Sequence, residues 1–169
     1  MLRKLQRILR HSWLDESDTR KAIPPELVER LAARVAASER RHTGEIRIYV
    51  EAGLPLSYLW REASPRERAI AMFGKLRVWD TEQNNGVLIY LLLAEHAIEI
   101  VADRGLAHVV GPGHWEVIVQ HMRDAFRAGR FEDGLTHALE EVSALLVEHF
   151  PLEPGAANPN ELPDTPVLG

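Results

Sequence analysis

The feature that most constrains the fold is an unbroken apolar run, Val87 to Leu93, in the middle of a chain of 169 residues. A strand with one face in water alternates apolar and polar residues, whereas a strand covered on both faces is apolar throughout. The run is far shorter than the roughly 18 residues that a membrane span needs. It therefore predicts a central strand with packed layers on both sides, in a chain long enough for one domain.

Other periodic segments supply the elements around this strand. Residues 45–51 alternate charged and apolar side chains, which predicts a strand covered on one face. Residues 97–102 follow the central strand so closely that the two should form an antiparallel hairpin. Apolar residues at helical spacing predict helices over 25–39, 65–76, 115–128 and 135–150. This order predicts an α/β fold, a three-layer α/β/α sandwich with a small mixed sheet containing a β-hairpin.

One of these helices has a clear start signal. Ser64 and Glu67 have the spacing of a capping box, and Pro65 stands between them at the first helical position. Downstream apolar side chains should form the inner face of this helix, namely Ala69, Ile70, Phe73 and Leu76.

Composition divides the chain into three parts. Residues 1–22 are a basic N-terminal segment, residues 23–150 carry the periodic elements of the domain, and residues 151–169 are rich in proline. The last segment holds five of the ten prolines and shows no helical or strand period, so we expect an extended, poorly packed tail.

The charges are unevenly distributed. Residues 1–41 contain ten basic and six acidic side chains, and residues 42–169 contain ten basic and nineteen acidic ones. A net acidic domain repels phosphate backbones, which argues against nucleic acid as a partner. In residues 1–10, leucines and isoleucine recur at helical spacing among basic side chains, which predicts weak contact with an anionic membrane. The alternative is a helix docked on its own domain or on a partner.

Several classes of site are excluded. Without cysteine the chain has no disulfide and no thiolate ligand, and a reduced, cytoplasmic setting fits this composition. The sequence motifs of phosphate-binding loops, dinucleotide-binding turns and serine nucleophile elbows are missing. None of the eight histidines is paired with another at helical spacing, so a zinc site would have to be a composite, for example of His108 and His114.

One polar segment precedes the central strand. Residues 80–85 all carry side-chain oxygens, the ligands that Ca²⁺ and Mg²⁺ prefer. Asp103 ends the second strand of the hairpin, where antiparallel pairing should bring it beside Asn85. The candidate metal ligands are therefore Asp80, Glu82, Asn84, Asn85 and Asp103. Alternatively, the same side chains only cap turns and pair with neighbouring arginines.

From about Ile23 to Phe150 the sequence resembles the TPM domain family, named for plant thylakoid, photosystem-repair and nematode members. The matching motifs are the helix with Phe73, Asn85-Gly86-Val87-Leu88, Ile98-Glu99-Ile100, Gly105-Leu106, and the run from Phe126 to Gly134. More narrowly, Val78–Gly86, Val101–Gly105 and Asn160–Asp164 are similar to segments of bacterial TPM proteins without export signals, which accompany LemA-type membrane proteins.

The resemblance implies a TPM-like domain over residues 23–150 and an α/β/α sandwich. Acid phosphatase activity has been assigned to plant relatives, and some bacterial relatives bind divalent cations in loops at one sheet edge. Many members have Asp-Asn-Gly where this chain has Asn84-Asn85-Gly86, and an acidic residue after Gly-Leu where it has Ala107.

Two functions follow as expectations. The first is a non-enzymatic TPM-type module that acts with a LemA-type or other membrane-associated protein, in the cytoplasm or at the periphery of the inner membrane, and that binds Ca²⁺ or Mg²⁺. The second is a metal-assisted phosphohydrolase in which a cation held by Asp80, Glu82 and Asp103 would activate water.

Overall fold

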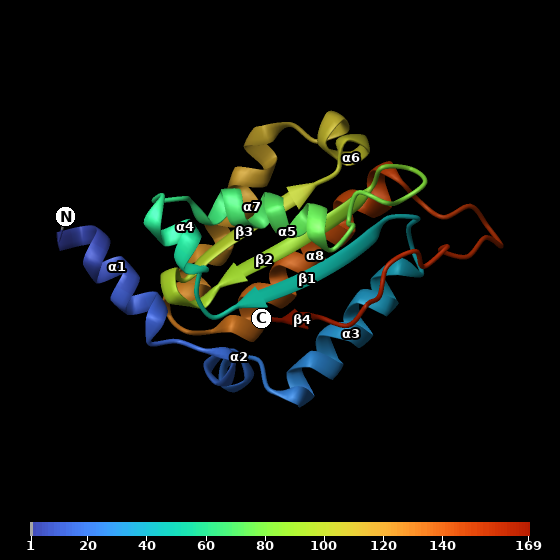
Figure 1. The fold of residues 1–169 in the computed structure, drawn as a ribbon. Coiled ribbons are helices and arrows are strands. Elements are labelled where there is room, and N and C mark those ends of the chain that lie inside the picture. Colours follow the sequence, from blue (N-terminus) through green and yellow to red (C-terminus); the bar gives the residue numbers. More distant parts are fainter. Residues whose placement is uncertain (1) are drawn as a thin grey trace.

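The apolar run forms the second strand of a mixed four-stranded sheet (Figure 1), in a computed structural model that describes residues 2–169. Strand β2 (Gly86–Leu92) pairs in parallel with β1 (Glu45–Glu51) and antiparallel with β3 (Ala97–Ala102). The short strand β4 (Val167–Leu168) extends the sheet in parallel beyond β1, giving the order β3-β2-β1-β4. The predicted central strand and hairpin are therefore confirmed.

Three long helices cover one face of the sheet. These are α3 (Pro25–Glu39), α7 (Pro112–Arg127) and α8 (Phe131–His149). Their apolar side chains form one continuous core with alternate residues of the strands, including Ile48 and Ile89. Pro25 begins α3 as the sequence predicts, because proline lacks the amide proton that a first helical turn leaves unpaired.

The opposite face is covered by α5 (Pro65–Lys75), the short helix α4 (Leu56–Trp60) and part of the C-terminal tail. Leu88, Tyr90 and Leu92 of β2 point to this side. The sheet thus lies between two layers, as the predicted three-layer sandwich requires (Figure 1).

Strand β1 differs from the sequence prediction, because both of its faces are buried. The charged residues Glu45, Arg47 and Glu51 lie beneath the second layer, where side chains and backbone groups bind them. The alternation of charged and apolar residues therefore marks a polar network inside the protein rather than a solvated face.

Helix α5 begins as predicted, and its buried face is only partly as predicted. The Ser64 side chain accepts a hydrogen bond from the backbone amide of Glu67, whose carboxylate accepts one from the Ser64 amide. Ala69 is buried, but Ile70 is 52% exposed and Met72 takes the inner position. Phe73 and Leu76 are half-buried against the second core, so Ile70 is the one predicted residue of this face that is exposed.

Several short elements were not expected from the sequence. They are α2 (Glu16–Ala22), α4, α6 (Arg104–Val109) and the 3₁₀ turn η1 (Leu93–Glu95). The hairpin turn lacks Asn-Gly chemistry, and His96 instead adopts the left-handed conformation (φ 46°) that closes it.

The prediction of a poorly packed tail is wrong. The tail is extended, but Leu162 is buried and Val167–Leu168 pairs with β1. The Gly169 amide donates a hydrogen bond to the Val50 carbonyl, and the Gly169 carbonyl accepts one from Ala52. Proline leaves a segment without periodicity but does not prevent it from packing against a sheet.

The predicted N-terminal helix is present as α1 (Leu2–Ser12). Met1 was part of that prediction and lies outside the described residues. It is docked on its own domain through buried His11, whose ring accepts a hydrogen bond from the Leu54 amide. Arg7 donates to Glu95 at 2.7 Å, and Ile8 packs against the second core. Within residues 2–169, no helix combines the length and apolar character that spanning a membrane requires.

Candidate functional sites

The loop between α5 and β2 holds the first two predicted ligands, Asp80 and Glu82. The Asp80 carboxylate forms an ion pair with Arg77, which adopts a left-handed backbone conformation. The backbone amide of Glu82 donates to Glu161 of the tail, at 3.1 and 3.3 Å to the two carboxylate oxygens. Both acidic side chains of this loop are exposed.

The hairpin brings Asp103 to this loop, as the sequence predicts. The Asp103 amide donates to the Gly86 carbonyl, and the Gly105 amide donates to the Asn84 carbonyl, both at 2.8 Å. The guanidinium of Arg104 also donates to the Asn84 side-chain oxygen at 3.2 Å. Gly105 is required here, because a Cβ atom would lie 2.5 Å from the Asn84 carbonyl oxygen.

Two oxygen atoms at this junction are buried without a hydrogen-bond partner among residues 2–169. They are Oδ1 of Asn85, a residue with no exposed surface, and Oδ2 of Asp103. The Asn85 amide group donates to Thr43, and Asp103 Oδ1 caps α6 by accepting from Arg104. Leaving a buried oxygen unpaired is costly, and in folded proteins an ion or a bound water commonly satisfies such an atom.

The predicted carboxylates do not converge on one point. Among the described residues, Asp80, Glu82 and Asp103 are not a set of three whose ligand atoms lie within 4.8 Å of one another. His108 and His114 likewise belong to no such set in residues 2–169. The assignment of Asp80, Glu82, Asn84, Asn85 and Asp103 as metal ligands stays a prediction.

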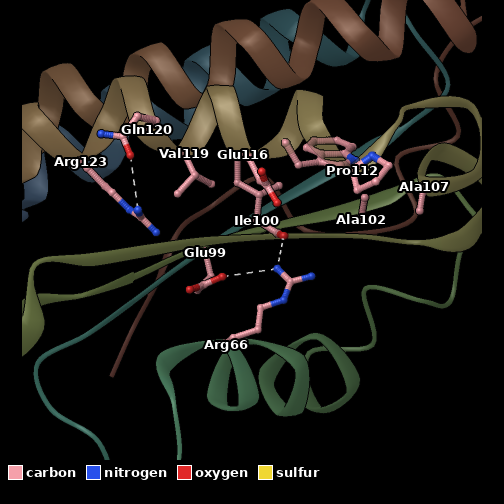
Figure 2. A pocket seen from close by; sticks show the side chains of 11 residues that line it. Arg66, Glu99, Ile100, Ala102, Ala107, Pro112, Glu116, Val119, Gln120 and Arg123 are labelled. Atoms are coloured by element: carbon pink, nitrogen blue, oxygen red, sulfur yellow. Dashed lines mark hydrogen bonds and ion pairs between the residues drawn. The ribbon is translucent and has the colours of Figure 1, made fainter.

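A pocket of about 570 Å³ lies at the open edge of the sheet, between α5 and α7 (Figure 2). Arg66 reaches from α5 to the Ile100 carbonyl and to the Glu99 carboxylate of β3, while Val119 and Arg123 approach from α7. Burial raises the pKa of Glu99. The described lining residues include no serine or histidine, and Arg66 covers the backbone of the strand edge through its hydrogen bond to the Ile100 carbonyl.

A buried ion pair lies under α5. Arg68 donates to Glu51 at 2.5 Å, and the Tyr90 hydroxyl donates to the other Glu51 oxygen at 2.9 Å. Tyr49 stacks on Tyr90, with the ring centroids 5.9 Å apart. Every group in this network has a partner inside the fold, which indicates a structural role.

The most exposed apolar side chains lie on α1 and α4 or beside them. Trp13 is 83% exposed and Trp60 is 69% exposed. Lys4 lies over the Trp60 ring at 5.0 Å, and the two helices contact each other. We call these exposed side chains the α1–α4 surface: Leu2, Arg3, Leu5, Leu9, Arg10, Trp13, Leu56 and Trp60.

One further cluster lies outside the residues that the sequence patterns predict as ligands. His121 of α7 meets His137 and Glu141 of α8, and it is the one such set of three within the described residues. Its signal in the sequence is a histidine and a glutamate four residues apart on one helix, a spacing that a comparison of histidines alone does not reveal.

Comparisons with known proteins agree with this architecture. A profile described as the TPM domain matches residues 17–145. The NMR structure of BA42 protein from the psychrophilic bacterium Bizionia argentinensis is 26% identical, with a TM-score of 0.75, over 87% of this chain and 95% of that one. The N-terminal domain of a protein from P. gingivalis is 19% identical, covers 78% and 83% respectively, and has a TM-score of 0.61, which shows the shared fold. No curated protein matches the sequence.

Proposed function

The chain belongs to the TPM domain family, and we propose that it is a non-enzymatic module that attaches to a membrane through the α1–α4 surface. The observation that carries this proposal is the exposure of Trp13, Trp60 and four leucines beside basic side chains. Exposed apolar patches of this kind mark interaction sites, because a solvated domain gains nothing from displaying them.

Helix α1 has one set of side chains that docks it on the domain and another set that stays exposed. Arg7 and His11 hold the helix on the domain by pairing with Glu95. Leu2 and Leu5 are more than half exposed, and Leu9 is 49% exposed. A helix anchored in this way presents leucine and tryptophan at a fixed angle, so it loses little conformational entropy on binding. Exposed Arg3 and Arg10 would add about 1 kcal/mol each near an anionic surface.

Vesicle co-sedimentation tests the proposal. We expect binding to vesicles containing phosphatidylserine or cardiolipin, weaker binding at high salt, and loss of binding in a Leu5→Ser, Trp13→Ser variant. Trp79→Ser is the matched control, since Trp79 is 50% exposed elsewhere on the molecule. Equal sedimentation of both variants, or none by the unmodified chain, would remove the membrane role.

The family resemblance suggests a LemA-type membrane protein as the partner at that membrane, with the chain on its cytoplasmic side. Crosslinking in intact cells should then capture such a protein with the unmodified chain and not with the Leu5→Ser, Trp13→Ser variant. Recovery of the same protein with both would place the contact on another surface.

We also propose that the junction of the loop and α6 binds Ca²⁺ or Mg²⁺. The unpaired oxygen of Asp103 supports this, because a bound cation would satisfy it. A cation at hundredfold excess over its Kd would stabilise the fold by about 2.7 kcal/mol. Asp103→Asn should abolish that stabilisation in thermal melts, whereas Glu29→Gln on α3 should keep it.

The alternative function, a metal-assisted phosphohydrolase using Asp80, Glu82 and Asp103, depends on the same cation. It would require Asp80 to leave Arg77, and both Asp80 and Glu82 to turn toward Asp103. Turnover of p-nitrophenyl phosphate with Mg²⁺ or Ca²⁺, from about pH 4 to about pH 9, would support it. Stabilisation by the cation without any turnover would leave a binding module.

A further inference from the structure

Two helices bring three metal-binding side chains together on the face of the molecule away from α5. His137 and Glu141 are one turn apart on α8, and His121 faces them from α7. His137 Nε2 lies 3.4 Å from Glu141 Oε1, and His121 Nδ1 lies 4.0 Å from the same oxygen. We propose that His121, His137 and Glu141 bind a divalent transition-metal ion of the zinc type.

The spacing of the ligand atoms fits such an ion closely. In a tetrahedral zinc site with bonds of about 2.0–2.1 Å, neighbouring ligand atoms are about 3.3 Å apart. All three ligand atoms lie within 4.8 Å of one another, so small side-chain rotations complete the geometry. The side chains retain that freedom, since His121 is 55% and His137 is 48% exposed.

Close packing fixes the two helices beneath the cluster. Gly134 of α8 lies against Phe126 of α7, where a Cβ atom would come 2.8 Å from the ring. Met122 is buried next to His121. The backbones that carry the three ligands are therefore held before any ion binds, which lowers the entropic cost of binding.

The donor set selects the class of ion. Two imidazoles and one carboxylate suit Zn²⁺, Co²⁺, Ni²⁺ or Cu²⁺, whereas Ca²⁺ and Mg²⁺ require mostly oxygen ligands. Three protein ligands leave a fourth position open, as in sites that hold a water molecule. A pocket of about 370 Å³ beside His121 and His137, which Asp124 and Asp133 also line, gives that position access to solvent.

Calorimetric titration of the full chain with Zn²⁺ tests the site, together with the absorption spectrum of bound Co²⁺. We expect one ion per chain at this site, with the intensity of a tetrahedral Co²⁺ complex, and higher melting temperatures with Zn²⁺ than with Ca²⁺. His121→Asn and Glu141→Gln should each weaken binding about tenfold or more.

His114→Asn is the matched control, because His114 is an exposed histidine on the same helix and outside the cluster. It should leave the affinity and the Co²⁺ spectrum unchanged. Circular dichroism without metal shows whether each variant is folded. Unchanged zinc affinity in folded His121→Asn, or an equal loss in His114→Asn, would overturn the proposal.

Discussion

At the scale of single residues, burial sets the protonation of two neighbouring side chains at the end of α3. Glu39 is almost fully buried, and desolvation raises its pKa to about 8, with Glu45 and Asp164 adding like charge. Burial also lowers the pKa of His42 to about 4. Ser38 and the Gly44 carbonyl satisfy the His42 ring, and the Ile46 amide donates to Glu39.

These two shifts have opposite consequences for stability. Between about pH 4.5 and 8 the folded chain keeps a proton on Glu39 that the unfolded chain releases, so stability falls as pH rises. Between about pH 4 and 6.5 His42 is protonated in the unfolded chain and neutral in the folded chain. The unfolded chain therefore binds more protons in this range, and stability rises with pH. The two effects oppose each other below about pH 6.5, and only that of Glu39 remains above it.

We therefore predict that the unfolding free energy falls between about pH 6.5 and 8, by at most about 1.4 kcal/mol per pH unit from Glu39. Glu39→Gln should flatten this fall, because glutamine keeps the acceptor for the Ile46 amide and cannot ionise. Urea unfolding at several pH values measures it. The exposed Glu29→Gln on the same helix should behave like the unmodified chain, and an undiminished fall in Glu39→Gln would contradict the argument.

At the scale of elements, the C-terminal tail is part of the sheet layer. The Leu162 amide donates to Glu45 at 3.0 Å, the backbone carbonyls of Pro163 and Thr165 accept from Arg47, and Gly169 closes the edge of β1. Removing residues 161–169 would leave buried charges of β1 without partners, which is strongly destabilising.

We expect that deletion to lower the melting temperature by about 5–10 °C, which corresponds to about 2–3 kcal/mol in a domain of this size. Leu162→Ala should produce a smaller fall in the same direction, because Leu162 is 7% exposed. Leu56→Ala serves as the control, since that side chain is 62% exposed. An unchanged melting temperature after the deletion would mean that the tail contributes no packing.

The tail also shows where the sequence could predict the fold and where it could not. The sequence predicts the central strand, up to Leu92, and the Ser64–Glu67 capping box, because local periodicity and local hydrogen bonds determine them. Strand β4 consists of two residues that are defined by their pairing with β1, and those residues carry no pattern of their own. Contacts between distant segments determine whether such elements form, and these contacts produce no periodic pattern in the sequence.

The candidate sites follow the same rule. The approach of Asp103 to the loop was predictable, since a hairpin fixes its own register: the sequence predicts Asp103 beside Asn85, and it is hydrogen-bonded to the next residue, Gly86. The partner of Glu51 was not predictable, because Arg68 reaches it from another layer. His121 likewise meets His137 only through the packing of two helices.

At the scale of the whole molecule, helix α1 and the sandwich are joined by few apolar contacts. The match to the TPM domain begins at residue 17, after α1 has ended at Ser12. Both cores draw their fully buried side chains from residues beyond this point, and Ile8 is the one residue of the described part of α1 that packs against them.

We therefore predict that a chain lacking residues 1–14 keeps a single cooperative unfolding transition. The loss of Ile8 and of the His11 contacts to Leu54 and Glu95 should lower the melting temperature by only about 2–5 °C, the equivalent of about 1 kcal/mol. The same chain should no longer bind anionic vesicles, yet should bind Zn²⁺ as before, because His121, His137 and Glu141 lie on helices that α1 does not support. Calorimetric melting, vesicle co-sedimentation and zinc titration of the one truncated chain measure all three. A truncated chain that unfolds without a cooperative transition would contradict this prediction. It would show that α1 belongs to the same folding unit as the sandwich.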